Sequence, residues 1–120
     1  AILGAGGEIM EINLSKDADK SICLIYKEYL RRRKSGSDKK SAKDFFYREQ
    51  WPDDFTEKGG LSDFLDTLRE LQNAGFIRRT MGGGFYLEAA GVIYMEQRFP
   101  NGLAQVLDWL GKFKSAIPFA

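Results

Sequence analysis

The segment 61–96 constrains the fold more than any other part of the chain. Its first part repeats apolar residues at helical spacing, so a helix over 61–74 has one apolar face and one polar face. The apolar positions are Leu61, Phe64, Leu65, Leu68 and Leu71. Gly75 follows, and we expect it to end the helix because glycine readily adopts the left-handed conformation that satisfies the last carbonyls.

Two short strands are predicted directly after this glycine. Phe76 and Ile77 favour a first strand, the three glycines at 82–84 supply a permissive turn, and residues 85–87 favour a second strand. The pattern therefore predicts a β-hairpin. Apolar residues recur at helical spacing beyond it, which predicts a further helix over 89–98.

A helix over 16–34 is predicted near the start of the chain. Ser15 offers an N-cap, Asp17 and Asp19 suit the positive end of the helix dipole, and residues 35–37 end the element. Four consecutive cations close this helix: Arg31, Arg32, Arg33 and Lys34. They have two interpretations, as cations favoured by the negative end of the dipole or as a secondary basic patch that meets phosphate.

A second, shorter helix is expected over 41–50. Ser41 and Asp44 form a weak capping box, and Pro52 stops the helix because the residue before a proline avoids helical geometry. Phe45, Phe46 and Trp51 would give this helix its apolar face. Residues 53–60 then form a connector, and Phe55 within it is expected to enter the core.

The last predicted helix spans 101–114 and is amphipathic. Its apolar side carries Leu103, Val106, Leu107, Leu110 and Phe113. That much apolar surface, added to a core that is already closed, is expected to find a partner, and a second copy of the chain is the commonest one. Residues 99–120 are therefore a candidate dimerisation element. The alternative is packing of this helix against the helix at 16–34 within one chain.

Taken together, these residues resemble a prokaryotic winged helix-turn-helix domain. The resemblance rests on the pattern Leu65-x-x-Leu68-x-x-Leu71-x-x-x-Gly75-Phe76-Ile77, the hairpin, and Tyr86-Leu87-x-x-x-Gly91-x-x-Tyr94-Met95-Glu96. It implies a mainly α fold with a small β-hairpin wing (α+β), a winged-helix domain over 15–98, and additional C-terminal helices. One departure is Glu88, because such domains often place there a threonine that caps the next helix.

Residues 1–14 are interpreted as a flexible N-terminal leader. Met10 is a candidate natural initiator, and the glycine-rich residues before it are either an artificial addition or a genuine flexible N-terminus. The whole chain is one domain of ordinary composition, with 43% hydrophobic and 29% charged residues, and it has no apolar run long enough to span a bilayer. A cytoplasmic location is expected.

The sequence argues against catalysis and metal binding. It contains no histidine and a single cysteine, Cys23, which reads as a small hydrophobe within a helix. The adjacent Asp53 and Asp54 lie in a connector without a positioned partner, and the glycines at 82–84 form a turn rather than a phosphate-binding loop. We therefore expect no enzyme activity, no cofactor and no metal.

The charges are distributed unevenly along the chain. Residues 15–43 have a net charge of +6, residues 44–75 of −5 and residues 76–120 of +2, whereas the whole chain carries only +1. In the helix over 61–74, turning the apolar face inward exposes Asp63, Asp66 and Glu70, and such carboxylates form a poor surface for the major groove. Any electrostatic function is therefore local.

Two functions are open from the sequence. The first is a small dimeric transcriptional regulator that binds double-stranded DNA, with these candidate contacts: Lys39, Lys40, Lys43, Thr67, Arg69, Arg78 and Arg79. The second is a winged-helix protein-interaction module, in which the acidic face of Asp63, Asp66 and Glu70 meets a basic protein partner.

Overall fold

The computed structural model describes residues 13–57 and 59–115 of the chain. It is mainly helical, with one small antiparallel sheet and two short 3-10 turns. In chain order the elements are α1 (Lys16–Lys34), α2 (Lys39–Ala42), β1 (Asp44–Phe45), η1 (Arg48–Gln50), η2 (Asp53–Phe55), α3 (Gly60–Asn73), β2 (Ile77–Arg79), β3 (Phe85–Leu87), α4 (Ala89–Arg98) and α5 (Leu103–Ser115).

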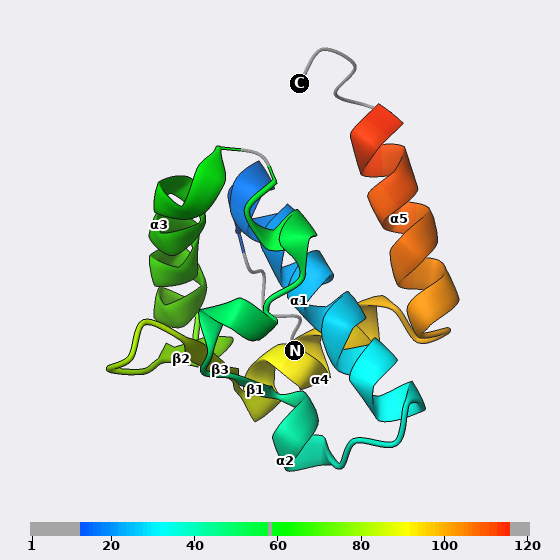
Figure 1. The fold of residues 1–120 in the computed structure, drawn as a ribbon. Coiled ribbons are helices and arrows are strands. Elements are labelled where there is room, and N and C mark those ends of the chain that lie inside the picture. Colours follow the sequence, from blue (N-terminus) through cyan, green and yellow to red (C-terminus); the bar gives the residue numbers. More distant parts are fainter. Residues whose placement is uncertain (1–12, 58, 116–120) are drawn as a thin grey trace, which may run out of the picture.

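Helix α1 is the centre of the molecule, with α3 on one side and α5 on the other (Figure 1). Its bounds agree with the predicted helix over 16–34. Ser15 is the N-cap, and its hydroxyl oxygen accepts a hydrogen bond of 3.1 Å from the Ala18 N–H. Because neighbouring elements cover it from both sides, α1 buries residues on most of its circumference, including Ile22, Ile25 and Tyr26.

Helix α3 begins and ends one residue before the predicted bounds of 61–74, and Ala74 is its C-cap. Gly75 has a φ of +85°, and the next N–H, that of Phe76, donates to the Leu71 carbonyl at 3.0 Å. The predicted glycine stop is therefore confirmed. The apolar face is buried at its centre but not at its start, since Leu68 and Leu71 are fully buried whereas Leu61 is 41% exposed.

The predicted hairpin is present, and a third strand joins it. The strand order is β1-β3-β2, and both pairs are antiparallel. In register, Tyr86 lies between Asp44 on one side and Arg78 on the other, while Phe85 lies between Phe45 and Arg79.

The predicted helix over 41–50 is wrong. Helix α2 ends at Ala42 and is capped by Asp38, whose Oδ1 accepts the Ser41 N–H at 2.7 Å, and the chain then extends into β1. The reason is a contact distant in sequence: the Phe45 ring stacks on the Phe85 ring with centroids 4.8 Å apart. Burial of this aromatic pair outweighs a weak local helix signal.

An aromatic cluster fills the space between the sheet and α3. The rings of Phe55 and Phe64 lie 5.3 Å apart, and Trp51 packs edge-on to Phe64. The indole N–H of Trp51 donates to the Phe45 carbonyl at 2.9 Å, so its polar atom is satisfied. The expectation that Phe55 enters the core is confirmed.

Helix α5 packs on α1 within the same chain, which is the arrangement given above as the alternative to a dimer. Val106 is fully buried and Leu110 is 7% exposed, so these two dimer candidates are already covered. Leu107 is 49% exposed and Leu103 is half-buried. The side chain of Phe113 lies outside the described residues, and the dimer stays a prediction.

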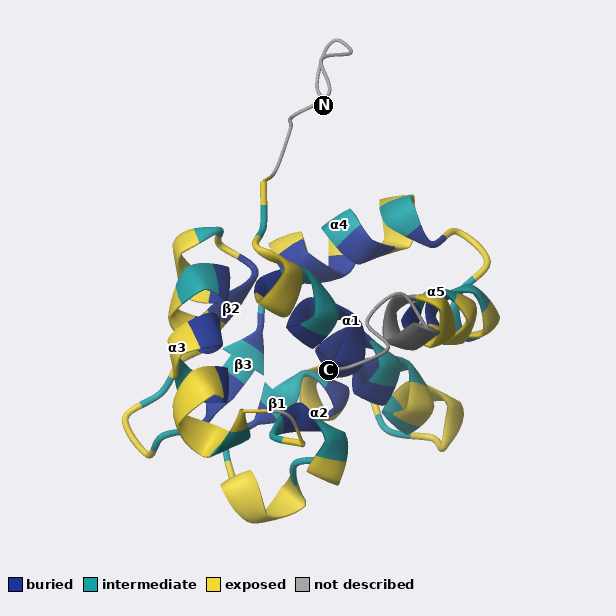
Figure 2. Ribbon diagram, turned by 90° about the horizontal axis from the view of Figure 1, so that it is seen from above, coloured by how far each residue is buried: buried dark blue, intermediate teal, exposed yellow. Residues whose placement is uncertain are grey.

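Exposed and buried residues separate clearly in the molecule (Figure 2). The buried faces of α1, α3 and α4 turn toward a common interior, and the outward faces of α3 and α5 are largely exposed. Among the residues that the structure describes, no helix combines the length and apolar character needed to cross a membrane.

Candidate nucleic-acid interface

Tyr86, on the central strand β3, is the focus of a cationic and aromatic surface. Residues directly opposite each other in an antiparallel pair project on the same face, so Tyr86 shares its face with Asp44 and Arg78. The Lys43 Nζ lies 5.7 Å from the centre of the Tyr86 ring, and the Arg78 Cζ lies 5.2 Å from it. We call Lys43, Phe46, Arg78 and Tyr86 the outer sheet face.

Phe46 completes this face. Its ring centre lies 6.2 Å from that of Tyr86, and both side chains are half-buried. The result is a pair of partly exposed rings with a cation on either side. Cations within about 6 Å of an aromatic ring are attracted to the face of the ring. Lys43 and Arg78 come from segments 35 positions apart, and the sheet brings them to one ring.

The two carboxylates beside this surface are engaged within the chain. Asp44 Oδ1 accepts the Phe46 N–H at 2.9 Å. Glu88 Oε2 lies 3.3 Å from Arg78 Nε, and the Arg78 side chain is still 57% exposed. Glu88 precedes α4 but makes no side-chain cap hydrogen bond, so it differs in role as well as in identity from the threonine of the resembled family.

Lys39 and Lys40 continue the cationic surface onto α2. Both are exposed, and Lys43 follows them as the C-cap residue of the same helix. Lys39, Lys40 and Lys43, three of the predicted DNA contacts, therefore lie in or directly after one short helix that leads into β1. Asp38 begins this helix, and hydrogen bonds from Ser41 lower the pKa of its carboxyl group.

The wing between β2 and β3 projects from the body of the protein (Figure 1). The Thr80 N–H donates to the Gly84 carbonyl at 3.0 Å, and the Gly83 N–H donates to the Thr80 carbonyl at 3.2 Å. Arg48 Nε donates to the Gly83 carbonyl at 3.2 Å, which ties the wing to η1. The wing is therefore held by hydrogen bonds within its own turn and by the hydrogen bond from Arg48 of η1.

At two of the three glycines in the wing, the structure explains why the residue is glycine. A Cβ on Gly84 would lie 2.1 Å from the Phe46 carbonyl oxygen, so only glycine permits this close approach of two backbones. Gly83 has a φ of +90° and lies against the Arg48 guanidinium. A Cβ on Gly82 would meet no atom within 4 Å.

Arg79 lies on the opposite face of β2 from Arg78. It is exposed, and its backbone N–H donates to Gln72 Oε1 at 2.7 Å, which links the wing to the end of α3. Successive strand residues project to opposite faces. The two predicted wing arginines therefore flank the wing instead of forming one patch.

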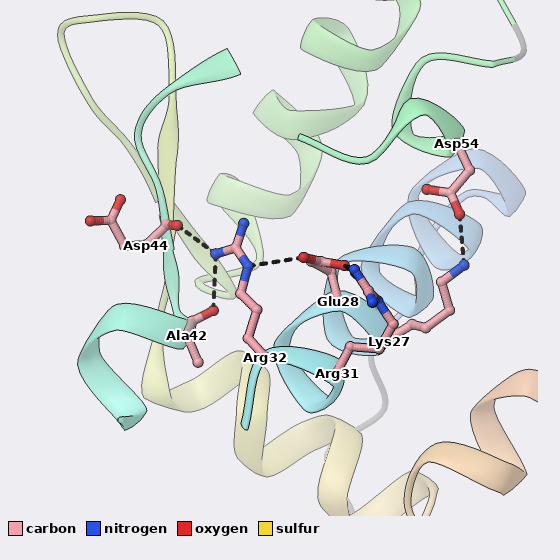
Figure 3. Close-up of polar contacts among 7 residues, drawn as sticks. All are labelled: Lys27, Glu28, Arg31, Arg32, Ala42, Asp44 and Asp54. Atoms are coloured by element: carbon pink, nitrogen blue, oxygen red, sulfur yellow. Dashed lines mark hydrogen bonds and ion pairs between the residues drawn. The ribbon is translucent and has the colours of Figure 1, made fainter. Parts of the chain in front are cut away.

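The cations at the basic end of α1 have two different roles: one makes structural contacts, and the others lie at the surface (Figure 3). Arg32 donates from Nε to Glu28 Oε2 at 3.0 Å and from Nη1 to the Asp44 carbonyl at 2.7 Å, and its Cζ lies 4.2 Å from the centre of the Phe45 ring. Its side chain is only 17% exposed. Arg32 therefore joins α1 to β1, and its assignment to a phosphate-binding patch is corrected.

The other three cations of this run stay at the surface. Arg31 donates to Glu28 Oε1 at 2.8 Å and is 60% exposed, and Arg33 donates to the Ser37 carbonyl at 3.0 Å. Lys34 is exposed. Nearby, Lys27 holds η2 through Asp54, with 2.6 Å between Nζ and Oδ2 (Figure 3).

Helix α3 differs from the recognition surface expected from the sequence. Thr67 is 9% exposed, so its candidacy as a DNA contact is wrong, because the helix is rotated to pack this residue inward. Arg69 is exposed, and its Nη1 lies 3.5 Å from Asp66 Oδ1 in an ion pair within the helix.

The predicted acidic face of α3 is also partly used within the chain. Glu70 accepts the Ser15 N–H at 2.8 Å and the Ser15 hydroxyl at 2.7 Å, so it joins α3 to the start of α1. Asp66 takes part in the ion pair with Arg69. Asp63 and Asp66 remain exposed.

The thiol of Cys23 is completely buried on α1, and burial raises its pKa to about 12. This agrees with its interpretation as a small hydrophobe. Within residues 13–57 and 59–115, no cluster of three or more His, Cys, Asp or Glu residues has a geometry that could hold a metal ion.

Phe46 and Tyr86 belong to this surface and Arg48 contacts the wing beside it, yet none of the three is predicted as a site residue from the sequence. The sequence predicts that Phe46 lies in a helix, and it identifies Tyr86 only as a residue that favours a strand. The available signal was alternation in the hairpin, because placing Phe85 and Leu87 inward puts Tyr86 outward beside Arg78. Nothing local in the sequence indicates that β1 brings Phe46 and Lys43 to the same place.

Comparisons with known protein families, curated proteins and solved structures gave no match to the chain.

Proposed function

We propose that this chain is a winged-helix protein that binds double-stranded DNA as a transcriptional regulator, and that it docks through the outer sheet face, α2 and the wing. One observation carries the proposal: Lys43 and Arg78, far apart in sequence, lie 5.7 Å and 5.2 Å from the centre of the same half-buried Tyr86 ring. Cations gathered on one projecting surface suit a regularly spaced row of phosphates.

The remaining charges support this choice of surface. Lys39 and Lys40 on α2 are exposed cations next to the outer sheet face, and Arg79 adds an exposed cation on the opposite face of the wing. Three carboxylates lie near this surface, and each has a contact within the chain: Asp44 accepts the Phe46 N–H, Asp38 accepts the Ser41 N–H, and Glu88 pairs with Arg78 itself. Phosphate contacts supply much of the affinity of DNA-binding proteins, so the cations on α2 and on the two faces of the wing are the candidate phosphate contacts.

The same reasoning argues against α3 as a reading helix in the major groove. Its outward face carries Asp63 and Asp66, and Thr67 points into the core. Carboxylates near phosphates are repelled, and their use in base reading is confined mainly to cytosine. In this proposal α3 supports the wing through the hydrogen bond from Arg79 to Gln72 and makes no major-groove contact.

The alternative is a protein-interaction module whose acidic face meets a basic partner. Asp63 and Asp66 favour it because they stay exposed. Two internal contacts weaken it, since Glu70 is bound to Ser15 and Asp66 pairs with Arg69. We therefore rank DNA binding first and keep the homodimer, through the exposed side of α5, as a separate prediction.

Fluorescence anisotropy with a labelled 30-base-pair duplex across a salt series tests the proposal. Wild type should bind at low salt, and the slope of log K against log salt should be about −0.9 for each phosphate contacted. The double variant Lys43→Glu with Arg78→Glu should weaken binding at least tenfold and make the slope shallower by about 2.

The matched control is Lys16→Glu with Lys112→Glu, which changes the net charge equally at exposed positions on α1 and α5. This control should bind nearly as wild type does. An absence of binding at low salt would reject DNA binding, and an equal loss in both double variants would reject the outer sheet face as its site. To test the alternative, a lysine-rich peptide should then bind wild type but not Asp63→Lys with Asp66→Lys.

A further inference from the structure

We infer that the wing bends the DNA by inserting Met81 between two base pairs in the minor groove, an inference that rests on the proposed DNA binding. The Met81 side chain is fully exposed, and it belongs to the turn that joins β2 to β3. The two residues after it are glycines, so no neighbouring side chain on that side of the turn shields it. An unbranched apolar side chain thus projects at the end of a narrow loop.

The wing holds this methionine in a defined place. Hydrogen bonds between Thr80 and Gly84 and between Gly83 and Thr80 close the turn, and Arg48 braces it through the Gly83 carbonyl. Gly84 fixes the returning strand against the Phe46 backbone. A side chain presented by a braced turn loses little further backbone entropy on insertion, which favours its use as a wedge.

The arginines beside Met81 match the walls of a groove. Arg78 projects on the Tyr86 side of the wing, and Arg79 projects on the α3 side. The minor groove is bounded on both sides by a phosphate backbone. A wing that enters it therefore places one guanidinium toward each strand, with the apolar tip directed at the base pairs.

The size of the wing requires the groove to open. The minor groove of B-DNA is only about 6 Å wide. Two paired strands already lie about 4.8 Å apart before their side chains are counted. Insertion of an apolar side chain between base pairs unstacks them, widens this groove and kinks the duplex by about 20–90° toward the major groove. The wedge thus removes the steric obstacle to wing entry.

Met81 lies on a different segment of the fold from the other exposed large hydrophobic residues. In the part of the chain that the structure describes, the other exposed large hydrophobic residues are Tyr47, which precedes η1, and Leu61, Ile93 and Leu107, which belong to α3, α4 and α5. Protein partners require a contiguous apolar area of several hundred Å². A single methionine between two arginines fits one base step flanked by phosphates better than it fits a protein surface.

The experiment uses a 30-base-pair duplex that contains TA steps, which unstack most easily, with a donor dye and an acceptor dye at its two ends. Wild type should increase energy transfer on binding, because a kink shortens the distance between the ends. Met81→Ala should retain affinity within about fivefold but lose the increase, and Met81→Leu should keep most of it. Leu107→Ala is the control at an exposed position on α5 and should behave as wild type.

A second readout places 2-aminopurine at the TA steps, where its fluorescence rises when the base is unstacked. Wild type and Met81→Leu should raise this signal, and Met81→Ala should not. Binding by wild type without a change in energy transfer, or equal bending by Met81→Ala, would overturn the wedge and leave DNA binding intact. If wild type does not bind the duplex at low salt, both proposals fail together.

Discussion

Replacing Arg32 by alanine should destabilise the fold without altering DNA binding by the folded protein. Arg32 makes three contacts that join α1 to β1: it donates to Glu28 on α1, donates to the Asp44 carbonyl on β1, and lies over the Phe45 ring of β1. Its side chain is 17% exposed, whereas the Arg33 side chain is at the surface with one hydrogen bond to Ser37. These adjacent arginines therefore separate a structural role from a surface role.

The magnitude follows from the contacts. Each hydrogen bond to a charged group contributes about 1.5–3 kcal/mol, and water that enters after truncation recovers part of it. The cation–π contact with Phe45 adds about 0.5–1 kcal/mol. Arg31 remains as a partner for Glu28, so the carboxylate is not left alone. We expect Arg32→Ala to lower the free energy of unfolding by about 2–4 kcal/mol, which is a large share of the 5–15 kcal/mol typical of a domain.

Urea unfolding followed by tryptophan fluorescence measures this effect, since Trp51 lies in the neighbouring aromatic cluster. The midpoint for Arg32→Ala should fall by about 1–2 M, and that for Arg33→Ala by less than about 0.5 M. Equal midpoints for the two variants would refute the structural role of Arg32. A salt slope that becomes shallower in Arg32→Ala alone, measured where the protein is folded, would restore Arg32 to the phosphate-binding surface.

Three further predictions follow from the same contacts. Gly84→Ala should lower the free energy of unfolding by more than about 2 kcal/mol because its Cβ would meet the Phe46 carbonyl oxygen, whereas Gly82→Ala should change it by less than about 0.5 kcal/mol; similar urea midpoints would contradict the close approach. Burial raises the pKa of the Cys23 thiol from 9.0 and that of the Tyr26 hydroxyl from 10.0, each to about 12. Both groups are neutral when folded, so each contribution is fully present below the unfolded pKa. It is lost as the pH rises from 9.0 toward 12 for Cys23 and from 10.0 toward 12 for Tyr26, by about 1.4 kcal/mol per pH unit for each group. Cys23→Ala should therefore show a shallower fall of the urea midpoint between pH 8 and pH 10.5, and an unchanged fall would exclude the thiol. The predicted homodimer should give twice the 13.6 kDa monomer mass in light scattering, and a monomer mass at high concentration would reject it.

The surface chosen for DNA binding has a consequence for how the protein would select its sites. A wing that opens the minor groove responds to how easily a sequence is deformed, because the cost of the kink depends on the base step. Contacts from Lys39, Lys40 and Lys43 would fix the position on the backbone without reading bases. We therefore expect a preference for flexible TA-containing sites over stiff A-tracts, which competition binding measures directly.

Several features were determined by the sequence because they depend on neighbouring residues. The α1 bounds follow from the Ser15 cap, the end of α3 follows from Gly75, and the hairpin follows from strand formers on both sides of a glycine run. Caps, glycine stops and helical periodicity act over only a few residues, so they can be read directly. The mainly helical architecture with a small antiparallel sheet was predictable for this reason.

Tertiary structure decided the features that depend on distant partners. Residues 41–50 carry a weak helix signal, yet Phe45 reaches Phe85 and Lys43 binds Leu87 through its backbone carbonyl, so the segment becomes β1. The same strand brings Lys43 beside Tyr86 and Arg32 against the Asp44 carbonyl, so one predicted cation joins the outer sheet face and another makes a structural contact. The sequence gives the number and order of the charged residues. Packing between distant segments decides which of them face the solvent, because burial is a property of the whole fold.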